Sequence, residues 1–434
     1  MRDACPIAYG HHMTTADPAG QPASAHPSAA GHPAALAPTA RGQRSLAPDV
    51  ARGLVLLGIA LANVPFFLYG RELGILFKPI TDAAADPWVN AVVAVLADNR
   101  SYPLFALLFG YGMTQILTRE FARGTEWPDA RRLLLRRNLW LIAFGAAHGV
   151  LLFFGDILGT YGLLGLALVL LIRASGRTLA IVGWLSFVFL AFTGIAEGLS
   201  GLFAETAGGE VAGAALFNSP GAETYVLAVL ARAGEWTLGM LVVPIAGLGL
   251  LAPMILGVWA ARLHILEQPA LHRRALGFTA GIGIPVSILG ALPIALALAG
   301  VIELPVVIEP FAAMLHAASG AIGGAGYVAL IALLVSGARR GGPRGGPTGG
   351  PISRLLAALG QRSLSGYLAQ SLVFVIVFAP YGLGLGATAS VAEATQIAVI
   401  TWIGTLVAAN LLAAGNQPGP AEWLLRRAVY GRRR

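Results

Sequence analysis

The sequence predicts an all-α, polytopic membrane protein with about ten transmembrane helices and with its N- and C-termini in the cytoplasm. Composition is the first reason: 56% of the 434 residues are hydrophobic and only 12% are charged, about half the charged share of a soluble domain. A soluble protein of this size could not shield so much apolar surface from water, whereas a bilayer accepts it. The other two reasons are the spacing of the apolar stretches and the placement of the arginines between them.

The first 43 residues predict a disordered tail. Residues 1–43 are rich in Ala, Pro, Gly, Ser and His, and they lack the apolar segment of a signal peptide. Because the histidines of this tail are separated by prolines and flexible chain, no metal site is predicted there. Cys5 is the only cysteine, so the sequence contains neither an internal disulfide nor a cysteine-based metal site.

Apolar stretches follow one another along the rest of the chain, each close to the length of a membrane helix, about 20 residues. They lie at 48–68, 101–118, 138–154, 157–173, 178–203, 237–259, 276–300, 309–336, 364–380 and 395–414. A Gly/Pro/Arg-rich segment at 337–353 predicts a cytoplasmic linker, which separates a bundle of about eight helices over 44–336 from a C-terminal region over 354–434. That region contains two membrane helices and, at 420–430, a basic amphipathic helix suited to the membrane surface.

The positive charges determine the predicted topology. The segment 119–137 carries six arginines and is therefore predicted to be a cytoplasmic loop. Alternating from there places 24 of the 29 Lys and Arg residues on the cytoplasmic side and only four on the other, with Arg52 inside the first helix. A net charge of +8 could indicate a nucleic-acid partner, but the basic residues lie between membrane helices rather than on a soluble domain. We therefore expect the lipid bilayer as a partner and no nucleic acid.

Polar residues within the apolar stretches are candidates for function, because a charge in the bilayer costs several kcal/mol unless it is paired or wet. Asp49 and Arg52 are three residues apart in the first helix, and they share a face with Asn63, which lies about 16 Å beyond Arg52. These three side chains are predicted to line the interior of the bundle. The structural alternative is that Asp49 caps the helix and Arg52 extends to the inner interface. Arg100 and Glu197 are expected near the outer surface, in contact with solvent.

The third and fourth helices form a short hairpin that contains a histidine and an aspartate. Gly155 is typical of a helix C-cap and Asp156 of the N-cap of the next helix. His148, in an otherwise apolar helix, either joins helices through hydrogen bonds or handles protons together with Asp156. Along a straight helix the two residues would be about 12 Å apart, so direct contact requires the turn to fold Asp156 back. His316, beside a Gly-rich run, is expected to serve packing.

Five motifs occur in order along the chain: Asp49 to Gly53, Leu104 to Gly112, Gly155 to Tyr161, Gly360 to Ser371, and Gly419 to Arg426. Together they resemble the YeiB-like bacterial membrane proteins, which end in the domain of unknown function 418. The resemblance covers nearly everything after residue 44. It implies a multi-pass protein of the bacterial plasma (inner) membrane, in a family whose activity is not established.

The first helix also resembles, more distantly, the transmembrane acyltransferases of the acyltransferase-3 and heparan-glucosaminide acetyltransferase types. In the acyltransferase-3 group a histidine eleven residues after the first-helix arginine is associated with acyl transfer, and here that position is Asn63. The heparan-type enzymes have an asparagine there and a histidine in the following loop, but the segment 64–100 contains no histidine. If the chain is an acyltransferase, His148 must therefore supply the base.

The sequence leaves three functions open. The first is an acyltransferase-like enzyme that moves an acyl group from cytoplasmic acyl-CoA, its co-substrate, to an envelope glycan or lipid, without a covalently bound cofactor. The second is a small-molecule transporter or flippase, and the third is a non-catalytic membrane scaffold. Nucleotide-binding, metalloprotease and serine-hydrolase motifs do not occur. The residues predicted to act are His148 and Asp156 in catalysis and Asp49, Arg52, Asn63 and Tyr161 in substrate binding, with no metal ligand.

Overall fold

The computed structural model describes residues 46–199, 218–337 and 350–431. Within these ranges the protein is all-α, with no strand beyond an isolated bridge between Leu73 and Pro79. Seven helices in this part of the chain are long and apolar enough to cross a membrane, and further apolar helices are shorter. The predicted class, an all-α polytopic membrane protein, is confirmed. The predicted tail at 1–43 and most of the predicted linker at 337–353 lie outside the described residues.

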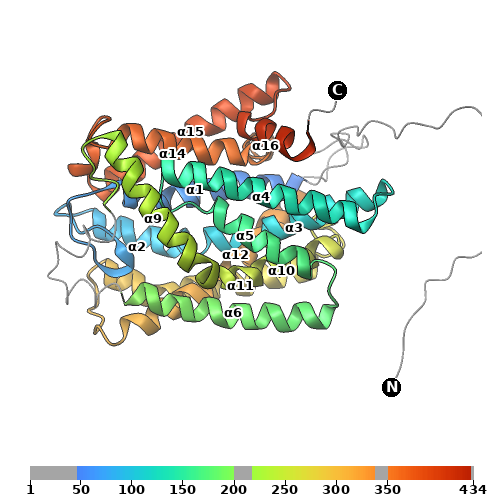
Figure 1. The fold of residues 1–434 in the computed structure, drawn as a ribbon. Coiled ribbons are helices and arrows are strands. Elements are labelled where there is room, and N and C mark those ends of the chain that lie inside the picture. Colours follow the sequence, from blue (N-terminus) through green and yellow to red (C-terminus); the bar gives the residue numbers. More distant parts are fainter. Residues whose placement is uncertain (1–45, 200–217, 338–349, 432–434) are drawn as a thin grey trace, which may run out of the picture. The chain divides into compact units, whose positions relative to one another are not determined.

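Figure 1 shows the order of the helices. They are α1 (Leu46–Asn63), α2 (Asp86–Leu96), α3 (Ser101–Ala122), α4 (Trp127–Leu151), α5 (Leu158–Leu171), α6 (Gly176–Gly198), α9 (Tyr225–Ala246), α10 (Leu251–Arg262), α11 (Arg273–Leu298), α12 (Glu309–Gly337), α13 (Pro351–Gly360), α14 (Ser363–Phe378), α15 (Val391–Ala414) and α16 (Pro420–Tyr430). Short 3-10 turns join some of them: η1 (Val64–Phe67), η2 (Ile75–Phe77), η3 (Gly247–Leu250) and η4 (Leu385–Ala387). Each of the ten predicted apolar stretches overlaps a helix of this series.

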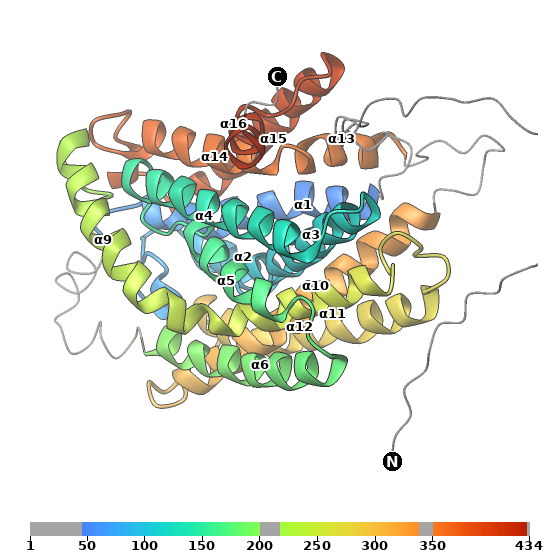
Figure 2. The same ribbon diagram turned by 45° about the vertical axis from the view of Figure 1, so that its right-hand side comes forward.

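The stretch 237–259, predicted as a single helix, is divided between two helices. α9 ends at Ala246, η3 intervenes, and α10 begins at Leu251. Gly247 and Gly249 explain the break, because glycine weakens a helix and a Cβ on Gly249 would collide with Leu190 of α6. In Figures 1 and 2 the two helices follow one another across the bundle, so the break does not reverse the path of the chain.

The arginine-rich segment 119–137, predicted as a loop, is mostly helical. α3 continues to Ala122 and α4 begins at Trp127, which leaves a four-residue turn. Gly124 in this turn has a φ of +78°, a conformation that favours glycine. Pro128 lies at the start of α4, where its fixed φ suits the first helical turn. Most of these arginines therefore lie on α3 and on the first three turns of α4 rather than on an irregular loop.

Two further helices were not expected from the sequence. α2 lies between the first two predicted membrane stretches and packs against α11 and α15. Asp86 in its first turn accepts hydrogen bonds from the first two backbone amides of α15, at 2.6 and 2.9 Å. α13 begins at Pro351, inside the predicted linker, and packs along α1. This packing is close, because a Cβ on Gly53 of α1 or Gly360 of α13 would collide with the backbone of the other helix.

The C-terminal helices share a core with the helices before them. One hydrophobic cluster contains buried residues of α1, α3, α12, α13, α14 and α15. In Figure 1 the start of α1, the turn between α3 and α4, and α16 lie toward one end of the bundle, while α2 and the turn between α14 and α15 lie toward the other. The first of these ends is the one that the charge pattern predicts to be cytoplasmic. That orientation, and the division of the chain at the linker, stay predictions.

Candidate functional site

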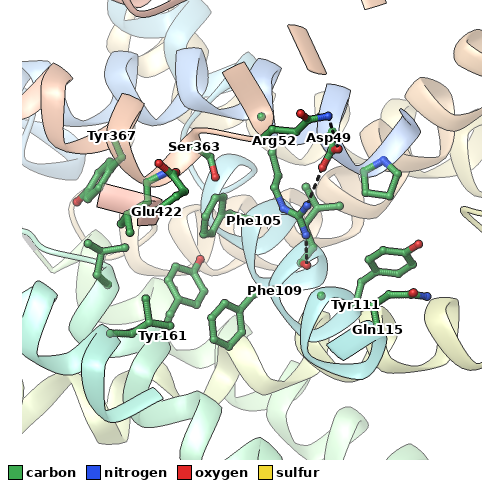
Figure 3. A pocket seen from close by; sticks show the side chains of 18 of the residues that line it. Asp49, Arg52, Phe105, Phe109, Tyr111, Gln115, Tyr161, Ser363, Tyr367 and Glu422 are labelled. Atoms are coloured by element: carbon green, nitrogen blue, oxygen red, sulfur yellow. Dashed lines mark hydrogen bonds and ion pairs between the residues drawn. The ribbon is translucent and has the colours of Figure 1, made fainter. Parts of the chain in front are cut away.

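One face of α1 borders a cavity inside the bundle. Asp49, Arg52, Leu56 and Ile59 are three or four residues apart, so they share a face of the helix, and all four line a cavity of about 340 Å³. Small-molecule sites usually measure about 300–1,000 Å³. Other lining residues come from α3, α4, α5, α14 and α16, among them Phe105, Phe109, Arg119, Arg137, Tyr161, Tyr367, Glu422 and Leu425. Figure 3 shows Tyr161 and Tyr367 toward one side of the cavity and Arg52, Asp49 and Tyr111 toward the other.

The ion pair expected from the spacing of Asp49 and Arg52 is present. Arg52 Nη1 donates to Asp49 Oδ1 over 3.1 Å, and Arg52 Nη2 donates to the backbone carbonyl of Leu108 on α3 over 3.1 Å. Asp49 is 1% exposed and also accepts a hydrogen bond from Gln361, at 3.1 Å. α1 begins at Leu46, so Asp49 lies inside its first turn and is not the N-cap considered in the structural alternative. The pair joins α1 to α3 and to the segment between α13 and α14.

Asn63 does not continue this face into the cavity. It is the last residue of α1, and neither cavity described here is lined by it. The lining positions of α1 end at Ile59, one turn earlier. The polar stripe predicted along the whole of α1 is therefore found only over its first part, and a binding role for Asn63 stays a prediction.

Arg137 is a cavity residue that the sequence analysis used only for topology. It lines the cavity from α4, and its guanidinium carbon lies 5.1 Å from the ring centroid of Phe109. Its Nη1 is buried and finds no hydrogen-bond partner among the described residues. Because an unpaired buried cation is costly, this position favours an anionic ligand. The available signal was helical spacing, since Arg137 lies four residues before the buried, cavity-lining Leu141.

α16 forms part of the cavity wall. The predicted amphipathic helix at 420–430 is present, and its Glu422 and Leu425 line the cavity. Glu422 Oε1 accepts hydrogen bonds from the backbone amides of Leu364 and Ser365, at 2.7 and 3.2 Å, and Oε2 accepts one from the Ser365 hydroxyl at 2.5 Å. A carboxylate at this place satisfies amides that the first turn of α14 leaves unpaired. Glu422 therefore attaches α16 to α14.

The turn between α4 and α5 brings His148 and Asp156 into direct contact. α4 ends at Leu151, four residues before Gly155, so Gly155 is not the C-cap that the sequence suggested. The chain then folds back, and Asp156 Oδ1 lies 2.8 Å from His148 Nδ1, with both side chains 0% exposed. On the other side of the ring, His148 Nε2 lies 2.8 Å from the Oγ of Ser371 on α14.

These hydrogen bonds assign the donor and acceptor roles. Asp156 Oδ2 accepts the backbone amide of Gly159 at 2.7 Å, which caps the start of α5. The neutral tautomer that fits these contacts has its proton on Nδ1, toward the Asp156 carboxylate, and offers the Nε2 lone pair to the Ser371 hydroxyl. A serine, a histidine and an aspartate in this orientation make the imidazole a general base. The sequence analysis missed Ser371 as a site residue, although it ends one of the motifs that carry the family resemblance.

Two tyrosines of the cavity on α1, Tyr367 and Tyr161, relate it to the contact between His148 and Asp156. Tyr367 lines that cavity, and its ring centroid lies 4.7 Å from that of His148. Tyr161 is 1% exposed and donates to the backbone carbonyl of Tyr102 over 2.6 Å. A second cavity, of about 280 Å³, is lined by Asp156 and shares Tyr161 with the first. The contact between His148 and Asp156 therefore adjoins both cavities.

A second buried polar cluster surrounds Arg100. The expectation that Arg100 contacts solvent is wrong, because it is 0% exposed. Its guanidinium donates to the hydroxyl and the backbone carbonyl of Ser287, at 2.9 and 2.6 Å, and to the carbonyl of Ala94 at 2.9 Å. His316, also 0% exposed, lies 2.9 Å from the same Ala94 carbonyl. Neither residue lines the two cavities, and the hydrogen bonds of this cluster join α2, α11 and α12.

The described part of the chain contains no set of side chains suited to bind a metal ion. No group of three or more His, Cys, Asp or Glu side chains in these ranges could hold a metal ion.

The chain is similar to known proteins over most of its length. Residues 260–432 match the family described as "Protein of unknown function (DUF418)". The uncharacterized protein YxaH of Bacillus subtilis (strain 168) is 26% identical over 411 residues, which cover 87% of this chain and 92% of YxaH. The uncharacterized protein YeiB of Escherichia coli (strain K12) is 35% identical over 125 residues, which cover 28% of this chain and 29% of YeiB. No solved structure matches the chain. The resemblance stated from the motifs is confirmed: the C-terminal part of the chain matches the DUF418 family, and the chain is similar to YxaH and YeiB.

Proposed function

We propose that the protein is an acyltransferase of the bacterial plasma membrane, which transfers an acyl group from cytoplasmic acyl-CoA to a hydroxyl of an envelope glycan or lipid. The observation that carries the proposal is the buried hydrogen-bonded chain of Ser371, His148 and Asp156 beside two cavities. A neutral imidazole oriented by a carboxylate can take the proton of an attacking hydroxyl. Such a base is what acyl transfer to an alcohol requires.

The larger cavity suits the acyl donor. Phe105 and Phe109 offer an apolar surface to an acyl chain, while Arg119 and Arg137 belong to the segment 119–137, which is predicted to be cytoplasmic. The buried Nη1 of Arg137 has no hydrogen-bond partner in the described ranges, which favours an anionic group such as a phosphate. A cavity of about 340 Å³ takes the acyl chain, so the nucleotide of CoA would stay among the arginines at its mouth.

The second cavity suits the acceptor. It borders the turn that carries Asp156, and it shares Ile157 and Tyr161 with the donor cavity. An acceptor hydroxyl approaching from this side would meet the thioester carbonyl near His148. The proton of the attacking hydroxyl would pass to Nε2, the carbon–sulfur bond would break, and the CoA thiolate would leave with that proton.

The test compares two histidines in the full-length protein, purified in nanodiscs made from an envelope lipid extract. Radiolabelled palmitoyl-CoA is added, and transfer of the label to lipid or glycan is measured. His148→Gln should reduce transfer by about 10²-fold or more while folding normally, because Gln can donate to Asp156 and accept from Ser371. His316→Gln, a matched change in the Arg100 cluster, should retain transfer. Full transfer by His148→Gln would rule the mechanism out.

A transporter or flippase is the second candidate, because the linings of two separate cavities meet at Ile157 and Tyr161. Movement of these two side chains would connect the cavities into a path. In that case, the labelled compound would cross the membrane chemically unchanged, and no CoA thiol would be released. Measuring free thiol in the same assay therefore separates the two functions.

A further inference from the structure

Ser371 has an unusual partner for a serine in a membrane helix. Ser and Thr within helices commonly donate to a carbonyl of the preceding turn of their own helix, as Thr114 does to Gly110 and Ser336 does to Leu333. The Ser371 hydroxyl instead meets His148 Nε2 at 2.8 Å, from a helix more than two hundred residues away in the chain. It is 3% exposed, so no bulk water competes for this hydrogen bond.

We propose that Ser371 is a covalent nucleophile, which receives the acyl group before the acceptor does. This inference rests on the proposed function. It follows from the direction of the hydrogen bonds: Asp156 holds the proton on Nδ1, and the free lone pair on Nε2 faces the Ser371 O–H. In serine enzymes the same arrangement raises the nucleophilicity of the hydroxyl oxygen.

The reaction then has two balanced steps. In the first, Ser371 Oγ attacks the thioester carbonyl, its proton passes to His148 Nε2, the carbon–sulfur bond breaks, and the CoA thiolate leaves with that proton. In the second, an acceptor hydroxyl attacks the acyl-serine ester and gives its proton to Nε2. The bond between Oγ and the acyl carbon then breaks, and Ser371 regains the proton.

The position of Ser371 fits a route from the donor cavity. Tyr367 precedes it by one turn on α14, so both side chains lie on one face of the helix. Tyr367 lines the donor cavity, and its ring packs against the His148 ring in a tilted arrangement, with 4.7 Å between centroids. Rotation of this one side chain would open Ser371 to a carbonyl at the inner end of the cavity.

The test looks for the acyl-enzyme directly. Full-length protein in detergent, without any acceptor, is incubated with radiolabelled palmitoyl-CoA and then denatured. The wild type should keep covalent label that resists neutral hydroxylamine and is released by alkaline hydroxylamine, as an oxygen ester is. Ser371→Ala should carry no label and should lose acyl transfer by about 10³-fold or more. Ser336→Ala should label like the wild type.

Ser371→Cys keeps the test decisive if Ser371→Ala folds poorly. A thiol at this position should still be acylated, and the adduct should now be released by neutral hydroxylamine. Transfer at the wild-type rate by Ser371→Ala, with no label on the wild type, would overturn the nucleophile and leave the acyltransferase standing. Absence of both transfer and label in the wild type would overturn the acyltransferase itself, and the nucleophile with it.

Discussion

Gly145 determines how closely α4 and α5 approach at the contact between His148 and Asp156. A Cβ at this position would collide with the backbone nitrogen of Gly159 and with Oδ2 of Asp156. These are the two atoms that form the cap at the start of α5. The absence of a side chain at position 145 is thus a condition for the geometry of the candidate catalytic group.

We expect Gly145→Ala to disturb that geometry. The added methyl group must push the start of α5 away, which should lower the free energy of unfolding by about 1–3 kcal/mol and reduce acyl transfer as Asp156 leaves His148. Gly234→Ala on α9 is the control, because a Cβ there meets nothing within 4 Å. Its stability should be unchanged or up to about 1 kcal/mol higher. Thermal unfolding in detergent measures both, and equal melting of the two variants would contradict the prediction.

The sequence predicted those site residues whose contacts are local. Asp49 and Arg52 are separated by one helical turn, and His148 and Asp156 flank one hairpin, so spacing alone limits their distance. Arg137 and Ser371 were not predicted as site residues, because their roles depend on how α4 and α14 pack in three dimensions. Arg100 was misjudged for the same reason: its burial is produced by α2, which was not predicted, and by α11 and α12.

Among the elements, α16 is the helix whose attachment depends most clearly on one side chain. Glu422 binds two backbone amides and one hydroxyl at the first turn of α14. On the exposed side of α16, Trp423 is 50% exposed, and Arg427 lies over its ring at 5.3 Å. The sequence identified this helix as a surface element, but its role as a wall of the cavity follows only from the packing of Glu422 and Leu425.

Glu422→Ala should loosen α16. Without the carboxylate, the first amides of α14 lose their cap, which should lower stability by about 0.5–2 kcal/mol. Hydrogen–deuterium exchange should accelerate at Leu364, at Ser365 and across 420–430. Glu303→Ala, at an exposed position between α11 and α12, should change neither stability nor exchange in these segments. Unchanged protection of α14 in Glu422→Ala would show that α16 is held by other contacts.

The presence of each membrane helix could be predicted from hydropathy, whereas the residues at which helices end or break could not. All ten predicted stretches overlap helices because each contains enough apolar residues to occupy the bilayer. The break at Gly247 and Gly249 was missed because an apolar run containing glycine still has a high mean hydropathy. α2 was missed because its eleven residues are too few to cross a membrane and its stability depends on packing against α11 and α15.

Across the whole molecule, the distribution of positive charge along the sequence agrees with the arrangement of the helices. The turn between α3 and α4, the start of α1 and α16 lie toward the same end of the bundle (Figure 1), and all belong to the segments that hold 24 of the 29 Lys and Arg residues. Arg119 and Arg137, which border the cavity, belong to the same segments. The proposed use of a cytoplasmic acyl donor requires that this positive end face the cytoplasm.

That orientation predicts which single cysteines a membrane-impermeant maleimide can reach in intact cells. Cys5→Ser removes the only native cysteine. In that background, Glu303→Cys, exposed between α11 and α12, should be labelled from outside, and Glu126→Cys, exposed in the turn between α3 and α4, should be labelled only after the membrane is opened. Both variants should label equally in detergent, which controls for reactivity. Labelling of Glu126→Cys in intact cells would place the arginine-rich helix ends outside, and it would contradict entry of a cytoplasmic acyl donor at that end.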